Sequence, residues 1–282
     1  SGDPFWAENC EDVAFNTYPA ATMPDFKALR YITCPNQITS DAKNHHPGID
    51  NSGPFLAMNP FSCRCCQHNH AQGWPYYAEH LILATPDNGA AVALYASCQA
   101  EIMVGNHQKI KIIENTNYPF EECIRLSIQT EKATEFPLYL RIPSWTRHAS
   151  LKINGKSAET PLTAGQYVRI QRTWNNGDSI ELTVPMHLSL RTWQVNKNSV
   201  SIDYGPLTFS LKIKERYVKR DSRQTAIGDS QWQQGADAGN WPSFEIFPAS
   251  AWNYALVLNK EDALKDFKIV RKNWPDDNFP FT

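Results

Sequence analysis

From Ala90 onward the chain consists of short runs in which apolar and polar side chains alternate, and this pattern restricts the fold more than any other feature. Alternation with a period of two places one face of each run against a core and the other in water, as in half-buried strands. Many such strands, separated by short turns, favour a β-sandwich. The runs are 92–96, 100–104, 109–113, 124–130, 136–142, 150–153, 167–171 and 179–184.

Turn residues between these runs indicate which strands follow each other as hairpins. Asn154-Gly155 is a preferred two-residue hairpin turn, so the strands on its two sides are expected to pair. The sequence Asn-Asn-Gly-Asp at 175–178 predicts a second hairpin in the same way. Residues 214–240 are polar and contain several Gln and Gly residues, which predicts a loop.

The first part of the chain has a helical pattern instead. Asp3 suits the N-cap of a helix and Pro4 its first position, so we predict a helix over 3–20. A second helix is predicted over 67–84, where Pro75 fits near the first turn or at a kink. Apolar residues of the first helix recur at helical spacing, and they are Trp6, Cys10, Val13 and Ala14.

Between the two helices the pattern predicts a strand over 28–38 and a polar loop over 41–60. The expected fold class is therefore mainly β, with a β-sandwich preceded by a short helical segment. We divide the chain into residues 1–90, which are helical, and residues 91–282, which form one or more β-sandwich domains.

Charge and hydropathy exclude two classes of partner. The 27 basic and 29 acidic residues leave a formal net charge of −2, so no broad positive field attracts a phosphate backbone, and we expect no nucleic-acid partner. The apolar runs are far shorter than the roughly 20 residues of a membrane helix, so we expect no membrane span. The chain is rich in aromatic residues, whose faces can pack on sugar rings, although most of them are expected in the core.

A cluster of thiols and imidazoles is the strongest chemical signal. Residues 63–70 read Cys-Arg-Cys-Cys-Gln-His-Asn-His, at the point where a loop meets the second predicted helix. Thiolate and imidazole are the ligands that zinc prefers, and a helix N-terminus lowers the pKa of a thiol. The chain has seven cysteines, an odd number, which is a poor disulfide framework. The cluster therefore indicates a metal site or a reactive thiolate, and the alternative is a pair of buried thiols that act as small apolar side chains.

The cluster and several downstream motifs together resemble one family. Cys-x-Cys-Cys precedes a helix, and Asn-Tyr-Pro-Phe follows at 117–120 and Leu-Tyr-Leu-Arg-Ile-Pro-Ser-Trp at 138–145. In this combination the chain resembles the β-L-arabinofuranosidase-like glycoside hydrolases of families 127 and 146. Further matching segments are Lys-Ile-Asn-Gly-Lys at 152–156, Arg-Thr-Trp-Asn-Asn-Gly-Asp at 172–178, Asp-Tyr-Gly-Pro-Leu at 203–207 and Ser-Ala-Trp-Asn-Tyr at 250–254.

The resemblance implies a retaining glycosidase with an (α/α)6 barrel followed by β-sandwich domains. It implies that the Cys65 thiolate is the nucleophile and is bound to zinc, with Cys66 as a further zinc ligand. Helices 3–20 and 67–84 would then be the end of the barrel, and the rest of the barrel would be a missing N-terminal part. The substrates implied are arabinofuranosides or related sugars of plant oligosaccharides and polysaccharides.

The remaining zinc ligands of the family come from a Glu-x-Cys motif, and a further glutamate is its acid/base. Glu8-Asn9-Cys10 has these letters but lies in the helix that resembles the last one of the barrel, so we assign it no ligand role. The resemblance places the true motif upstream of this chain, so we expect the chain alone to be inactive. The family has Pro-Asn after its cysteine pair, whereas Gln67 to His70 follow here, so His68 and His70 are candidate substrate-binding residues.

Two other functions fit the same sequence. The chain could be a non-catalytic carbohydrate-binding or scaffold protein that kept the fold and lost the chemistry. It could also be a zinc-structured interaction domain, whose four ligands would be Cys63, Cys65, Cys66 and either His68 or His70. Residues near the cluster that could face a sugar, or simply pack or be exposed, are His45, His46, Trp74, Tyr76, Tyr77, Glu79 and His80.

Overall fold

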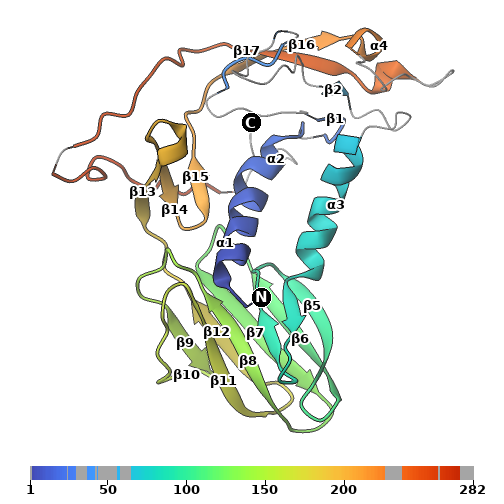
Figure 1. Ribbon diagram of the computed structural model, residues 1–282, viewed down its shortest axis with the longest axis vertical. Helices are drawn as coiled ribbons and strands as arrows, with labels where there is room; N and C mark the ends of the chain where they lie inside the picture. Colours follow the sequence, from blue (N-terminus) through green and yellow to red (C-terminus); the bar gives the residue numbers. More distant parts are fainter. Residues whose placement is uncertain are drawn as a thin grey trace. The chain divides into compact units, whose positions relative to one another are not determined.

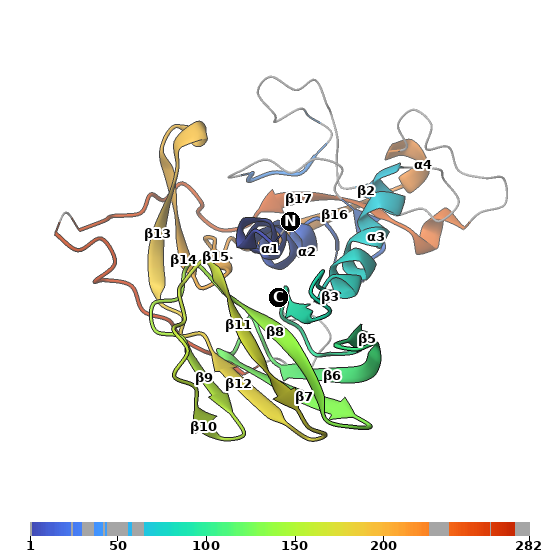
Figure 2. The same ribbon diagram turned by 60° about the horizontal axis from the view of Figure 1, so that its bottom comes forward.

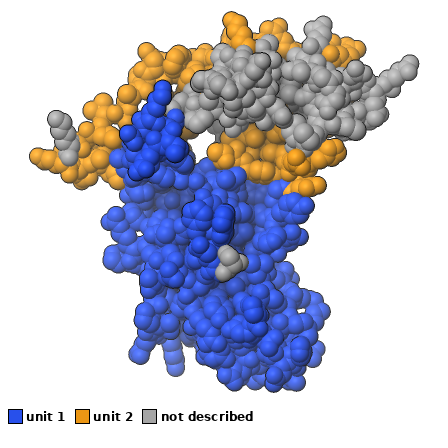
Figure 3. Space-filling model, viewed as in Figure 1, with its two compact units in different colours: residues 1–16, 73–209 blue, residues 17–72, 210–282 orange. Residues whose placement is uncertain are grey.

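Two β-sheets form a sandwich in one of the two compact units into which the chain divides. The computed structural model describes residues 2–23, 25–29, 37–41, 43, 56–57, 65–225, 237–259 and 261–273. Unit 1 comprises Ser1–Asn16 and Gly73–Phe209, and unit 2 comprises Thr17–Gln72 and Ser210–Thr282 (Figure 3). The predicted division at residue 90 stays a prediction.

The sandwich of unit 1 consists of a six-stranded sheet in the order β10-β9-β12-β7-β6-β5 and a four-stranded sheet in the order β11-β8-β4-β3 (Figure 1). Neighbouring strands are antiparallel except β4 and β8, which run parallel. The strands are β3 Ile82–Ala84, β4 Ala90–Val92, β5 Cys98–Val104, β6 Gln108–Thr116, β7 Cys123–Thr130, β8 Thr134–Ile142, β9 Ser150–Ile153, β10 Lys156–Ser157, β11 Gln166–Trp174 and β12 Ser179–Thr183.

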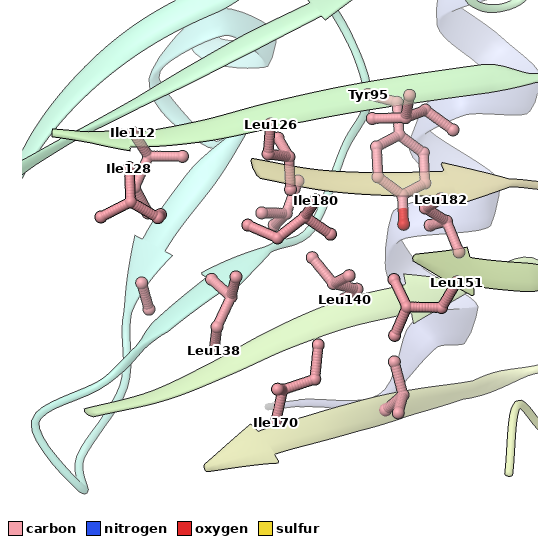
Figure 4. Packing of buried hydrophobic residues seen from close by; sticks show 14 of the residues in the cluster. Tyr95, Ile112, Leu126, Ile128, Leu138, Leu140, Leu151, Ile170, Ile180 and Leu182 are labelled. Atoms are coloured by element: carbon pink, nitrogen blue, oxygen red, sulfur yellow. The ribbon is translucent and has the colours of Figure 1, made fainter. Parts of the chain in front are cut away.

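The alternating side chains of both sheets meet in a single buried core. Ile112, Leu126 and Ile180 project from the six-stranded sheet, and Leu138 and Ile170 project from the four-stranded sheet (Figure 4). Burial of each such side chain contributes roughly 1.5–3 kcal/mol relative to leaving it exposed. The predicted β-sandwich fold is therefore confirmed. One run was misplaced, because the strand lies at 90–92 and residues 93–96 leave the sheet.

One of the two predicted hairpins is confirmed and the other is wrong. Asn154 and Gly155 adopt positive φ angles of 52° and 75°, and β9 pairs with β10 across them. The turn at 175–178 instead carries the chain from one sheet to the other, because β11 pairs with β8 while β12 pairs with β7 and β9. A turn motif shows that the chain reverses, but the partner of each strand is set by the core face that it must bury.

The carboxylate of Asp178 holds this sheet-to-sheet turn together. It accepts hydrogen bonds from the backbone N–H of Asn175 at 2.9 Å and from the side chain of Asn154 at 2.7 Å, and Arg172 lies 3.5 Å away. Although desolvation acts in the opposite direction, the hydrogen bonds from Asn175 and Asn154 and the charge of Arg172 lower the pKa of Asp178. A carboxylate with a lowered pKa stabilises the fold at neutral pH and loses this effect in acid.

We expect Asp178→Asn to lower the free energy of unfolding at pH 7 by about 1–3 kcal/mol, the usual contribution of hydrogen bonds to a charged group. The difference from the wild type should be complete above the pKa of an unfolded Asp and should shrink as the pH falls through the lower pKa of the folded state. Urea unfolding of both proteins at pH 7 and pH 3.5 measures it. A difference that is the same at both pH values would contradict this role of the charge.

The helical segment at the N-terminus follows the prediction closely. α1 spans Pro4–Asp12, and the Asp3 side chain accepts a hydrogen bond from the Phe5 N–H at 3.0 Å, as expected of an N-cap. A π-helical turn, η1, follows over Val13–Thr17, and α2 covers Tyr18–Ala20.

The second helix was predicted too far toward its C-terminus. α3 spans Cys65–Glu79 and contains Pro75, and residues 82–84 are not helical but form β3. β3 pairs with β4, with Ile82 opposite Val92, across a turn in which the Thr85 N–H donates to the Gly89 carbonyl. A short apolar run is compatible with a helix or with a strand. Residues 82–84 form a strand because they pair with β4.

The remaining elements are short. Unit 1 also contains a three-stranded sheet of β13 Leu188–Trp193, β14 Ser199–Tyr204 and β15 Leu207–Phe209, with the 3-10 turn η2 Gln194–Asn196 between the first two. Figure 2 shows this sheet beside strands β9 to β12. Besides α2 and the start of α3, the elements of unit 2 are β1 Ala28–Leu29, β2 Leu56–Ala57, β16 Glu215–Arg220, α4 Ser222–Thr225, η3 Ala238–Asn240 and β17 Ser243–Pro248.

Two predictions for residues of unit 2 differ from the structure. The polar stretch 214–240 is not simply a loop, because β16 pairs with β17 along six residues, from Glu215 opposite Pro248 to Arg220 opposite Ser243. Of the strand predicted over 28–38, residues 28–29 form β1 and residues 37–38 are not in a strand. Residues 30–36 lie outside the described residues, as does most of the predicted loop 41–60. Within the described part of the chain, every helix is too short or too polar to cross a bilayer.

A buried ion pair connects α1 to the sandwich within unit 1. The guanidinium of Arg141, on β8, donates to the Glu11 carboxylate, and both side chains are essentially inaccessible to water, with 0% and 1% exposed. The Tyr118 hydroxyl donates to the same carboxylate at 2.8 Å, and Arg141 Nε donates to the Ala93 carbonyl at 2.7 Å. Burial raises the pKa of Glu11, and the charge of Arg141 and the hydrogen bonds from Tyr118, from Arg141 and from the Tyr95 backbone oppose the increase.

Candidate active site at the start of helix α3

The cysteine cluster lies at the beginning of α3. Cys65 and Cys66 are the first two residues of this 15-residue helix. The free N–H groups and the positive end of the helix dipole act on this first turn, and both favour a thiolate over a thiol. The side chains of Cys65 and Cys66, and the whole of Cys63, lie outside the described residues. The nucleophile and the zinc ligands therefore remain predictions.

His68 and His70 lie on the same first turns of the helix. The side chain of His68 is exposed, and that of His70 is half-buried. Position 70 is four residues beyond position 66 and position 68 is three beyond position 65, so each shares a helix face with one cysteine position. His68 thus shares a helix face with the predicted nucleophile Cys65, and His70 shares one with the predicted zinc ligand Cys66.

His70 is held by a residue that the sequence analysis did not identify. The imidazole stacks on the ring of Tyr18, with centroids 4.1 Å apart and planes inclined by 2°. The Tyr18 hydroxyl donates to the His70 carbonyl, and His70 Nε2 lies 3.2 Å from the Tyr18 carbonyl oxygen. The two residues are 52 positions apart and no motif links them, so spacing offered no signal.

The described thiols elsewhere are poor candidates for a nucleophile. Burial is the main cause that raises the pKa of Cys10 and of Cys123, and it raises the pKa of Cys98 to about 11. A raised pKa leaves little thiolate at neutral pH. Cys10, Cys98 and Cys123 are therefore poor nucleophiles at neutral pH.

Glu8-Asn9-Cys10 has other contacts. The Glu8 carboxylate accepts hydrogen bonds from the backbone N–H of Ser144 at 2.6 Å and from its hydroxyl at 2.5 Å. These contacts give Glu8 a structural role between α1 and the end of β8. Among the residues that the structure describes, no three His, Cys, Asp or Glu side chains form a group suited to a metal ion.

The aromatic residues of α3 divide between packing and exposure. Tyr77 is buried and makes edge-to-face contacts with Trp74 at 5.9 Å and with Phe15 at 5.8 Å, so it packs α3 within unit 1. Trp74 and Tyr76 are exposed. The exposed His80 lies with Nδ1 2.7 Å from the Tyr76 carbonyl and 3.6 Å from Glu79. His45 and His46 lie outside the described residues.

Known families and structures match the chain over both its helical and its sandwich parts. Residues 1–79 match the family model of the GH127 catalytic domain of β-L-arabinofuranosidase, and residues 89–186 match the model of the GH127 middle domain. Together the two matches cover more than half of the chain. A search of the curated proteins found no significant match.

Three solved structures share the fold. A GH127 β-L-arabinofuranosidase from Geobacillus stearothermophilus T6 aligns with a TM-score of 0.60 and 22% identity, over 87% of this chain and 44% of its own. A glycoside hydrolase aligns with a TM-score of 0.62 and 20% identity, over 88% and 46% of the two chains. A GH127 β-arabinofuranosidase aligns with a TM-score of 0.59 and 20% identity, over 88% and 43%.

The chain therefore spans less than half of the length of these solved chains. Both family models name the same glycoside hydrolase family, and their order along the chain follows the observed succession of helical segment and sandwich. The protein belongs to the GH127 family of β-L-arabinofuranosidase-like glycoside hydrolases.

Proposed function

We propose that this chain forms part of a retaining glycosidase that acts on arabinofuranosides or related plant-polysaccharide sugars, with the thiolate of Cys65 as its nucleophile. The observation that carries the proposal is the match of residues 1–79 to the GH127 catalytic domain, within which a cysteine pair begins α3. The catalytic acid and the remaining zinc ligands would be residues outside those that the structure describes.

The proposed chemistry has two steps. The sulfur of Cys65 forms a bond to the anomeric carbon while the bond to the leaving oxygen breaks, and a carboxylic acid gives that oxygen its proton. A water molecule, deprotonated by the resulting carboxylate, then displaces the sulfur. Two displacements at one carbon return the sugar in its original configuration. The start of a helix suits the first step, because it favours the charged thiolate.

Zinc fits the donor set that the sequence provides. Thiolates are soft ligands, and structural and catalytic zinc sites commonly use them. Cys65 and Cys66 would hold the ion. When bound, zinc keeps its thiol ligands deprotonated at neutral pH.

A hydrolysis assay tests the proposed function. We would assay this chain, and the longest natural protein that contains it, with nitrophenyl β-L-arabinofuranoside and with the α-L anomer as the matched control. The longer protein should release nitrophenol from the β-L substrate, and should contain about one zinc ion per chain by elemental analysis. Sugar binding without hydrolysis of either anomer would instead support a carbohydrate-binding role.

A further inference from the structure

Tyr18 and His70 contact each other at three points, all within unit 2. The two rings stack in parallel, the Tyr18 hydroxyl donates to the His70 carbonyl, and His70 Nε2 reaches the Tyr18 carbonyl oxygen at 3.2 Å. Each residue thus binds the backbone of the other. This arrangement restrains both the position and the rotation of the imidazole.

The hydrogen bond at Nε2 determines the tautomer of His70. A backbone carbonyl oxygen can only accept, so Nε2 must carry the proton that it donates. In a neutral imidazole the other nitrogen, Nδ1, then has a lone pair and can only accept. Among the described residues, the ring contacts of His70 are those with Tyr18.

The location of His70 indicates what Nδ1 could accept. Position 70 lies one helical turn beyond Cys66, on the same face of α3. Sugars present hydroxyl donors, and an imidazole nitrogen with a fixed lone pair is a directional acceptor for one of them. Nδ1 of this tautomer can only accept a hydrogen bond, whereas the amide of Asn or Gln can present either a donor or an acceptor.

We propose that Tyr18 is a positioning residue that holds His70 as the Nε2–H tautomer, so that Nδ1 accepts a hydrogen bond from a hydroxyl of the sugar. The part that concerns the sugar rests on the proposed function, whereas the tautomer does not. The two parts are therefore tested separately.

Nitrogen NMR of the chain labelled with ¹⁵N-histidine tests the tautomer. The His70 signals are identified by their loss in His70→Gln, and the protonated nitrogen is distinguished from the unprotonated one by its chemical shift. For the neutral ring we expect one tautomer, with the proton on Nε2. Both Tyr18→Leu and Tyr18→Phe keep the backbone carbonyl, so they act only through the position of the imidazole against it. Tyr18→Leu, which removes the stacked ring and the hydroxyl, should convert the single tautomer to a mixture, and Tyr18→Phe, which keeps the stack, should convert it less. A proton on Nδ1, or a mixture in the wild type, would overturn the proposal.

Two substitutions of His70 test the contact with the sugar. The amide of Asn reaches the position of Nδ1, whereas the amide of Gln reaches that of Nε2. In the longest natural protein that contains the chain, His70→Asn should keep KM within about threefold, and His70→Gln should raise KM by about 5–10-fold with a smaller change in kcat, as expected for one lost hydrogen bond. A larger increase in KM for His70→Asn than for His70→Gln would contradict the contact between Nδ1 and the sugar. It would show that His70 acts through the structural hydrogen bond of Nε2. A protein inactive on every arabinofuranoside would overturn the sugar contact together with the proposed function, while the NMR result would still decide the tautomer.

Discussion

Arg141→Met should lower the free energy of unfolding of the sandwich by about 3–5 kcal/mol, because it leaves the Glu11 carboxylate buried without its partner. The carboxylate would retain the hydrogen bonds from the Tyr118 hydroxyl and from the backbone of Tyr95, but no counter-charge. The Ala93 carbonyl would also lose the donor that it has in Arg141 Nε. A buried charge without a counter-charge is among the few causes of destabilisation of this size. Urea unfolding, followed by tryptophan fluorescence, measures it.

Two further variants separate the ion pair from simple loss of side-chain volume. Adding Glu11→Leu to Arg141→Met removes the unpaired charge, so the double variant should be more stable than Arg141→Met alone. Arg125→Met is the matched control, because Arg125 forms an exposed pair with Glu181 at 3.5 Å and should contribute at most about 1 kcal/mol. Equal losses for Arg125→Met and Arg141→Met would contradict the account of the buried pair.

Cys65→Ser should reduce hydrolysis of β-L-arabinofuranosides by at least about 10³-fold, because removal of a catalytic nucleophile leaves only binding and electrostatic contributions. A serine hydroxyl is not ionised at neutral pH and is a poor ligand for zinc. The loss should appear in kcat, measured in the longest natural protein that contains this chain.

Cys123→Ser is the control for this substitution. Cys123 lies in β7 of the sandwich, and desolvation raises the pKa of its thiol. Its replacement should leave kcat and KM unchanged. Activity that survives in Cys65→Ser and fails in Cys66→Ser would move the nucleophile to the neighbouring residue and contradict the assignment.

The sandwich could be predicted from the sequence because its signal is local. Burial alternates along 124–130 as the sequence pattern predicts, and the run 136–142 also forms a strand, although both of its faces are largely buried. The Asn154-Gly155 hairpin was also local, because the turn requires positive φ angles that these residues tolerate. The partners of β11 and β12 were predicted wrongly, since two strands joined by a turn can pair or can separate into opposite sheets.

Contacts between distant residues could not be predicted in this way. Glu11 and Arg141 are 130 positions apart, and Tyr18 and His70 are 52 apart. A charged residue within the apolar run 138–142 was the only available signal for the ion pair, and nothing indicated Tyr18. The individual roles of Cys65 and Cys66 came from family resemblance, because the cluster of thiols and imidazoles alone indicates a metal site or a reactive thiolate but not which cysteine has which role.

The most direct test of the central claim is peptide mass spectrometry after reaction with an electrophilic L-arabinofuranose derivative. The wild-type protein, in the longest natural form that contains this chain, should carry one sugar adduct on the peptide with Cys65, and excess arabinose should protect it. Cys65→Ser should remain unlabelled, and Cys123→Ser should be labelled like the wild type. An adduct on a carboxylate instead, in a protein that still hydrolyses the substrate, would contradict the thiolate mechanism.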